Sequence, residues 1–213
     1  PYVLREEREA YEATVREDGF IDYQFLERDS QGSLIRRAEH DAYTVVHYIE
    51  PLESNRAALG FDVGSNQMRL ETLNKARDSG QIMATPPITL VQQEGIEQWG
   101  FLAFLPVYET HNPALIEARG TNLRGFTVGV FNMKNLIETA MIGLRDESIH
   151  LQIFDVDATQ GDILIYDQNA VGERLKMLNS FTVIKNITVA GRSWRLEFYT
   201  LPSFNSRYQT SFP

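Results

Sequence analysis

The sequence predicts an α+β fold, in which antiparallel sheets pack with helices. The first observation is the order of the early elements, a helix, two strands, a helix and three strands, which suits a five-stranded antiparallel sheet with helices on one side. The second is a later block of mostly strand character. With 213 residues, 43% of them hydrophobic, the chain can form one large domain or two small ones.

Local patterns predict each element of the first block. A segment rich in Glu and Arg with few breakers favours helix, and alternating or β-branched residues favour strands. Pro86 and Pro87 hold Thr85 in an extended conformation, so a strand follows them. The expected elements are a helix at 2–18, strands at 20–29 and 43–51, a helix that ends at Ser79, and strands at 88–93, 99–109 and 125–132, the last two joined by a polar loop.

The helix within GFDVGSNQMRLETLNKARDSG carries a charge where an apolar side chain is expected. Arg69 shares a helix face with Leu73 and Ala76, because residues three and four apart are neighbours. A charge on this face is costly unless something negative meets it. Arg69 therefore either pairs with an acid such as Asp62 or Glu71, with its stem packed on the core, or forms part of a binding site.

Both ends of this helix carry capping signals. Asp62 or Ser65 can cap its first turn, and Gly80 suits a left-handed stop. We expect Asp62 to be structural, capping the helix or bracing the loop before it.

The second block begins with an apolar helix, MKNLIETAMIGL, at 133–144. The segment DVDATQGD resembles a calcium loop, but Gln160 and Tyr166 occupy the positions that need glycine and a carboxylate, which favours a strand-turn-strand link. We expect this block to form a smaller β-rich or α+β unit, with the helix as connector. Its expected strands lie at 150–157, 161–168, 181–191 and 192–201.

Composition narrows the classes of partner. The net charge of −9 argues against nucleic acid or an anionic membrane surface as partner. The absence of cysteine excludes disulfides and thiolate chemistry.

The sequence contains no run long and apolar enough to cross a membrane, and its beginning is too charged for a signal peptide. We expect the chain as given to be soluble, which is compatible with a soluble piece of a membrane protein.

Motifs for catalysis are not found. Four histidines lie without metal-ligand spacing, so neither a metal site nor a cofactor is expected. His47, in an alternating strand, is best interpreted as a half-buried, hydrogen-bonded side chain. The sequence contains no G-x-S-x-G elbow, P-loop or G-x-G-x-x-G motif. An enzyme is therefore not expected, and a hydrolase built on acidic residues is the minor alternative.

Three longer stretches carry a family resemblance. YIEPLESNRAALGFDVGSNQMRLETLNKARDSGQIMATPPITLVQQ, followed by GFLAFLPVY and LRGFTVGVF, resembles the CHASE domain, the extracytoplasmic sensor module of membrane-bound histidine kinases, diguanylate cyclases and cytokinin receptors. The resemblance runs from Tyr11 to Val130 and implies two PAS-like subdomains after a stalk helix. The implied parts are the end of the stalk helix at 1–18, a membrane-distal ligand-binding subdomain at 12–131, a connector helix at 132–144 and a membrane-proximal subdomain at 145–213.

The resemblance also implies the ligand site. Arg69 falls where cytokinin receptors have an aspartate that contacts adenine, and an arginine cannot accept hydrogen bonds from purine N–H groups. The substitution argues against cytokinins and favours a carboxylate or another anion. Phe104 replaces a threonine and points to a compact ligand. The implied ligand-binding residues are Arg69, Leu73, Thr85, Val91, Leu102 and Phe104.

Two hypotheses about function follow. The first is a periplasmic sensor domain of an inner-membrane receptor, flanked by transmembrane helices and expected to form a homodimer, that binds a small anion. The alternative is an interaction or dimerisation module without a diffusible ligand. Thr85 can serve the ligand or simply hydrogen-bond its own loop.

Overall fold

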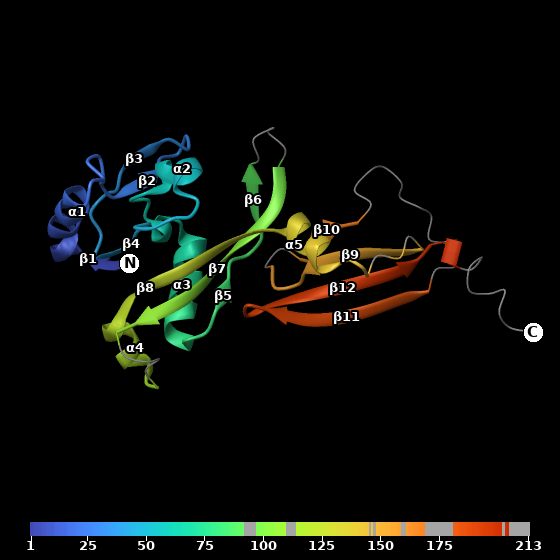
Figure 1. Ribbon diagram of the computed structural model, residues 1–213. Helices are drawn as coiled ribbons and strands as arrows, with labels where there is room; N and C mark the ends of the chain where they lie inside the picture. The colour runs from blue at the N-terminus through green and yellow to red at the C-terminus, as the bar shows by residue number, and fades with distance from the viewer. Residues whose placement is uncertain are drawn as a thin grey trace, which may run out of the picture. The chain divides into compact units, whose positions relative to one another are not determined.

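The α+β class is confirmed by a computed structural model, in which antiparallel sheets and helices are combined (Figure 1). Two compact units form the chain. Unit 1 comprises Pro1–Met83 and Phe104–Val128, and unit 2 comprises Ala84–Ala103 and Gly129–Pro213. The structure describes residues 1–91, 97–109, 114–144, 146, 148–158, 161–168, 181–201 and 203–204.

The units share two long strands, because β7 and β8 each begin in one unit and end in the other. The first part of the chain contains β1 (Tyr2–Leu4), η1 (Arg5–Glu7), α1 (Arg8–Glu17), β2 (Leu26–Arg28), β3 (Leu34–Arg36), β4 (Ala42–Thr44), α2 (Leu52–Asn55), η2 (Arg56–Ala58), η3 (Val63–Ser65), α3 (Gln67–Ser79) and β5 (Met83–Ala84). The rest contains β6 (Ile88–Val91), β7 (Glu97–Tyr108), α4 (Ile116–Asn122), β8 (Leu123–Asn132), α5 (Met133–Ala140), β9 (Ile149–Asp155), β10 (Ile163–Asp167), β11 (Thr182–Val189) and β12 (Arg192–Thr200).

The expected five-stranded sheet is wrong for the described strands. The early strands form two separate ribbons, β1 with β4 and β2 with β3, while β5, β7 and β6 form another sheet in which β8 pairs with β7. A fourth sheet has the order β10-β9-β12-β11, and all of its pairs are antiparallel. The predicted boundaries at 131 and 145 stay a prediction from the family.

Two local expectations need correction. The opening helix is shorter than 2–18, because Tyr2–Leu4 pairs with β4 and buries Val3, so the α-helix begins only at Arg8. The polar loop before β8 contains a helix, α4, which packs on α3. There Arg119 donates to the backbone oxygen of Asp78 at 2.5 Å.

A buried carboxylate organises unit 1. Glu12, on α1, is 2% exposed and accepts hydrogen bonds from Phe25 N at 2.9 Å and from Arg8 at 3.2 Å. Its other oxygen meets Arg36 at 3.1 Å. The surrounding core, joined by edge-to-face aromatic contacts, consists of Val3, Val15, Tyr23, Phe25, Tyr43 and Val45.

Unit 2 has its own core around Trp194. The indole of Trp194 meets Phe101 edge-on with ring centroids 5.5 Å apart, and it is 3% exposed. Both tryptophans of the chain, Trp99 and Trp194, lie in unit 2. The other buried members are Ala84, Phe101, Ala103, Met133, Leu151, Ile153, Ile165 and Tyr166.

Replacing Glu12 by Gln is expected to lower the free energy of unfolding by about 3 kcal/mol, because the substitution leaves buried arginine charge uncompensated. Urea unfolding followed by circular dichroism measures this change. Glu9→Gln, at an exposed position of the same helix, is the matched control and should have little effect.

The same carboxylate makes stability depend on pH. Burial alone would raise the pKa of Glu12, but the Phe25 N–H and the arginines Arg8 and Arg36 outweigh burial and lower the pKa. Its contribution is therefore complete above the pH at which the unfolded carboxyl titrates and is lost as the pH falls through the lower, folded pKa. The difference between wild type and Glu12→Gln should shrink in acid, and a constant difference would contradict this assignment.

Candidate functional site

The helix that carries Arg69 has well-formed ends. The Asn66 side chain accepts a hydrogen bond from Arg69 N at 3.2 Å, and Gly80 closes the helix in the left-handed region with φ 67°. Asn66, rather than Asp62 or Ser65, is therefore the N-cap, and Gly80 is the predicted stop. Leu73 and Ala76 are buried on the face that Arg69 borders.

Asp62 braces the loop before this helix, as expected. One oxygen accepts from Thr44 N at 2.9 Å and from Gly64 N at 3.0 Å. The other accepts from Arg37 Nε at 2.8 Å. Asp62 is 1% exposed and is engaged by these three donors, so it does not neutralise Arg69.

Arg69 is a partly buried cation that has no acidic partner among the residues that the structure describes. Within the described ranges, no carboxylate lies within 4.0 Å of its guanidinium, and Glu71 accepts instead from Gln67 at 3.0 Å. The guanidinium carbon lies 5.9 Å from the centroid of the Phe61 ring. Burial lowers the pKa of Arg69, and the positive charge of Arg28 lowers it further. The arrangement leaves donors available for an anion.

Thr85 has a structural partner. Its backbone N–H donates to Leu102 O at 2.8 Å, and its Oγ1 accepts from Leu102 N at 3.1 Å. Thr85 is fully buried and Leu102 is 8% exposed. Thr85 thus hydrogen-bonds β7 and not its own loop, as the structural alternative had expected, and its role toward a ligand stays a prediction.

The remaining implied residues are divided between the two units. Phe104 is fully buried in unit 1, where its ring centroid is 6.3 Å from that of Phe126. Leu73 is likewise a core side chain of unit 1. Thr85, Val91 and Leu102 belong to unit 2, and the side chain of Val91 lies outside what the structure describes.

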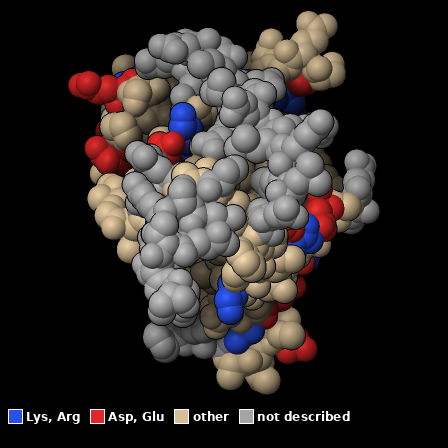
Figure 2. All heavy atoms as spheres, turned by 90° about the vertical axis from the view of Figure 1, so that its right-hand side faces the viewer, with Lys and Arg blue, Asp and Glu red and all other residues tan. Residues whose placement is uncertain are grey.

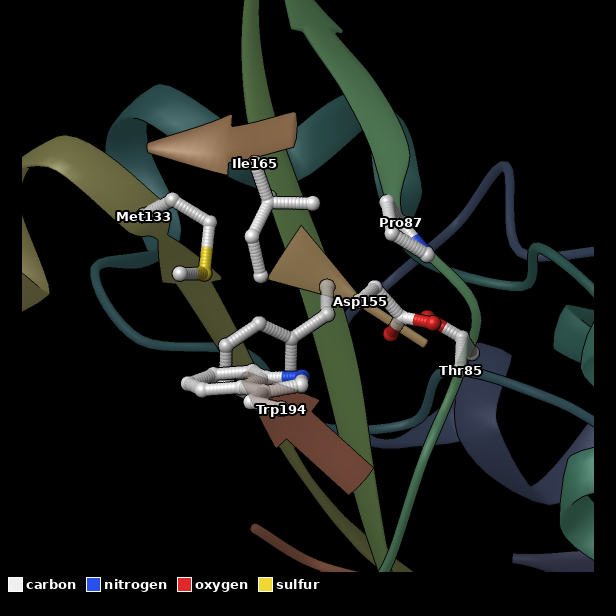
Figure 3. Close-up of a pocket in the computed structure, with 8 residues that line it drawn as sticks. Thr85, Pro87, Met133, Asp155, Ile165 and Trp194 are labelled. Atoms are coloured by element: carbon white, nitrogen blue, oxygen red, sulfur yellow. The ribbon is translucent and has the colours of Figure 1, made fainter. Parts of the chain in front are cut away.

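Unit 2 contains a small cavity, shown in Figure 3. Its volume of about 10 Å³ is the space of one water molecule, too small for an organic ligand. Asp155 points toward it but is held by Arg192, with contacts of 2.6 and 2.5 Å. The lining residues are Thr85, Pro87, Gly100, Phe101, Met133, Asp155, Ile165 and Trp194.

Sequence reasoning missed Arg28 and Phe61 as neighbours of Arg69. Arg28 stands between Glu27 and Asp29, a pattern that suggests local neutralisation. In the structure Glu27 pairs with Arg37 at 2.5 Å, whereas Asp29 accepts from backbone N–H groups of its own turn. Only the tertiary pairing reveals that Arg28 has no acidic partner in the described part of the chain, so no signal in the sequence identifies Arg28 as a neighbour of Arg69.

The described residues contain neither a metal-binding cluster nor a membrane-spanning helix. No cluster of three or more His, Asp or Glu side chains there is placed to hold a metal ion. None of the described helices combines the length and apolar character needed to cross a membrane. Among the coloured residues in Figure 2, basic and acidic atoms are interspersed.

The described structure defines the class of the protein as an α+β module with two units, each with its own core. Unit 1 also contains the partly buried Arg69. A family model, the CHASE domain, matches residues 1–166, and the chain therefore belongs to the CHASE domain family. CHASE domains are sensor modules of signalling receptors and are not catalytic.

The chain is also similar to a curated protein whose name places it in signal transduction. The chain is 24% identical over 198 residues to "Hybrid signal transduction histidine kinase A" of Dictyostelium discoideum. The match covers 83% of this chain and 9% of that protein's length.

Thr85→Val is expected to destabilise unit 2 by about 1–3 kcal/mol, because it leaves the buried Leu102 N–H without an acceptor. Thr85→Ser keeps the acceptor and should recover most of the loss. Urea unfolding followed by tryptophan fluorescence measures both variants, and a neutral Thr85→Val would show that this hydrogen bond is not structural.

Proposed function

We propose that the chain is the extracytoplasmic ligand-sensing domain of a transmembrane receptor, and that it binds a small anion in unit 1, with Arg69 as the anion contact. The observation that carries the proposal is the partly buried guanidinium of Arg69, which has no carboxylate partner among the described residues. Membership of the CHASE family supports the sensory role.

The energetics favour an anionic ligand. Removing a guanidinium from water is unfavourable unless a negative group compensates it. A carboxylate can accept two parallel hydrogen bonds from arginine, each contributing about 1.5–3 kcal/mol. Phe61 offers an apolar surface beside this contact. A compact carboxylate is therefore the proposed ligand class.

The other proposed ligand residues keep a weaker basis. Leu73 and Phe104 are buried in the same unit as Arg69. Thr85, Val91 and Leu102 remain in the proposal through their family positions alone.

The proposed signal is a shift between two arrangements of the domain, because a ligand acts only through different affinities for two states. In this proposal residues 12–131 form the distal PAS-like subdomain, 132–144 the connector, and 145–213 the proximal subdomain facing the membrane. Flanking transmembrane helices, a periplasmic location, a homodimer and a cytoplasmic output such as a histidine kinase complete the proposed receptor.

A second candidate function is an interaction module, favoured by the exposed apolar side chains of β11. This strand lies at the edge of its described sheet, and Val183, Ile184 and Ile187 are 52%, 55% and 42% exposed. Exposed apolar edge strands can pair with other chains.

For this second function, Ile184→Lys should abolish any concentration-dependent self-association seen by sedimentation, because a charge on an edge strand opposes pairing. A monomer at all concentrations, or association that the variant leaves intact, would contradict it.

The ligand proposal is tested by thermal shift against organic acids, amino acids and purines, since a ligand of the folded state raises the melting temperature. An acid that binds should lose about ten- to a hundredfold in affinity in Arg69→Gln. Arg124→Gln removes an equal charge at an exposed, paired site of unit 1 and is the matched control. Acid binding that survives Arg69→Gln would refute the proposal.

A further inference from the structure

We infer that the anion site of unit 1 takes a ligand with two carboxylates, one on Arg69 and the other on Arg28, across the ring of Phe61. The inference rests on the proposed function and deepens it, because it specifies the ligand as a dicarboxylate instead of any small anion.

The backbone places Arg28 on the same face as Phe61. Leu26 and Phe61 form a parallel bridge, in which Leu26 N donates to Gly60 O at 2.9 Å and Asp62 N donates to Leu26 O at 2.8 Å. Side chains two residues apart in a strand share a face, so Arg28 extends from the face of β2 that carries Leu26. Bridge partners lie on one face, which brings Arg28 to the side of the Phe61 ring.

Arg69 reaches the same ring from α3, with its guanidinium carbon 5.9 Å from the ring centroid. Two elements distant in sequence thus supply one cation at the ring, Arg69, and a second, Arg28, on the face of β2 that the ring shares. The charge of Arg28 contributes to the lowered pKa of Arg69, so each guanidinium lies within the other's field.

The acids nearest in sequence are engaged elsewhere. Glu27 accepts from Ala38 N at 2.8 Å and pairs with Arg37, while Asp29 accepts from Gln31 N at 2.8 Å and Ser33 N at 2.9 Å. Asp62 and Glu71 are occupied as described above. Across the described residues, neither arginine forms a salt bridge, so their mutual repulsion is not compensated by a carboxylate of the protein.

Arg28 has donors to offer. Its Nη1 donates to Gly32 O at 2.5 Å, which fixes the side chain to its own turn and uses one of five guanidinium N–H groups. The side chain is exposed, whereas Arg69 is half-buried. A ligand can therefore place one carboxylate on the half-buried Arg69 and the other on the exposed Arg28.

Two separated cations distinguish ligands by charge. A monocarboxylate neutralises one guanidinium and leaves the other repelled, while a dicarboxylate neutralises both and forms twice as many charge-assisted hydrogen bonds. We expect the dicarboxylate to bind at least about tenfold more tightly than the monocarboxylate of equal length.

Isothermal titration of the purified chain with butyrate and succinate, then with pentanoate and glutarate, at one fixed low ionic strength, measures this ratio. Arg28→Gln should bring the ratio between the two acids toward one, and Arg28→Lys should retain part of it because the charge remains. Arg69→Gln should weaken both acids. Arg124→Gln should keep the wild-type ratio, and circular dichroism confirms that each variant is folded.

The outcomes separate the two proposals. Equal affinity for mono- and dicarboxylates, or a ratio that Arg28→Gln leaves intact, overturns the dicarboxylate inference while an effect of Arg69→Gln preserves the proposed function. Inorganic phosphate that binds more tightly than every dicarboxylate also overturns it, because one dianionic group would then suffice. No binding of any acid, or binding insensitive to Arg69→Gln, overturns the proposed function and the inference together.

Discussion

The burial of the Glu12 carboxylate is the constraint on which unit 1 depends. A single side chain on α1 accepts from the backbone at Phe25 and from arginines of two segments, so the helix and the following chain are fixed together. Arg36 meets this carboxylate, and its neighbour Arg37 reaches Glu27 and Asp62 instead. These adjacent arginines thus bind different acids, and Asp62, which Arg37 holds, braces the loop before α3.

The acidic composition of the chain conceals how its positive charges are distributed. Despite the net charge of −9, the buried acids of unit 1 are saturated by specific donors. Arg69 lies beside the Phe61 ring, and neither it nor Arg28, whose charge acts on it, has a carboxylate partner among the described residues. The proposed anion binding by this unit therefore depends on which arginines the fold leaves without a carboxylate among the described residues, and the net charge of the chain does not reveal this.

Local sequence determined much of the fold, because its strongest signals are short-range. The helix α3 and its Gly80 stop, the long strands β7 and β8, and the strand-turn-strand link after Asp155 were predicted from periodicity and capping. The pairing of Tyr2–Leu4 with β4 and the helix in the loop before β8 were missed, since both depend on distant partners. Of the two arginines of the proposed site, the sequence predicts Arg69 but not Arg28, because only the tertiary structure shows that Glu27 and Asp29 are occupied.

The placement of both tryptophans in unit 2 has a practical consequence. The indole rings of Trp99 and Trp194 lie in a different unit from Arg69. Tryptophan emission thus originates in unit 2, which contains neither of the two proposed anion-binding arginines. An acid that binds at Arg69 and changes this emission would therefore report a response of unit 2, and no attached dye would be needed.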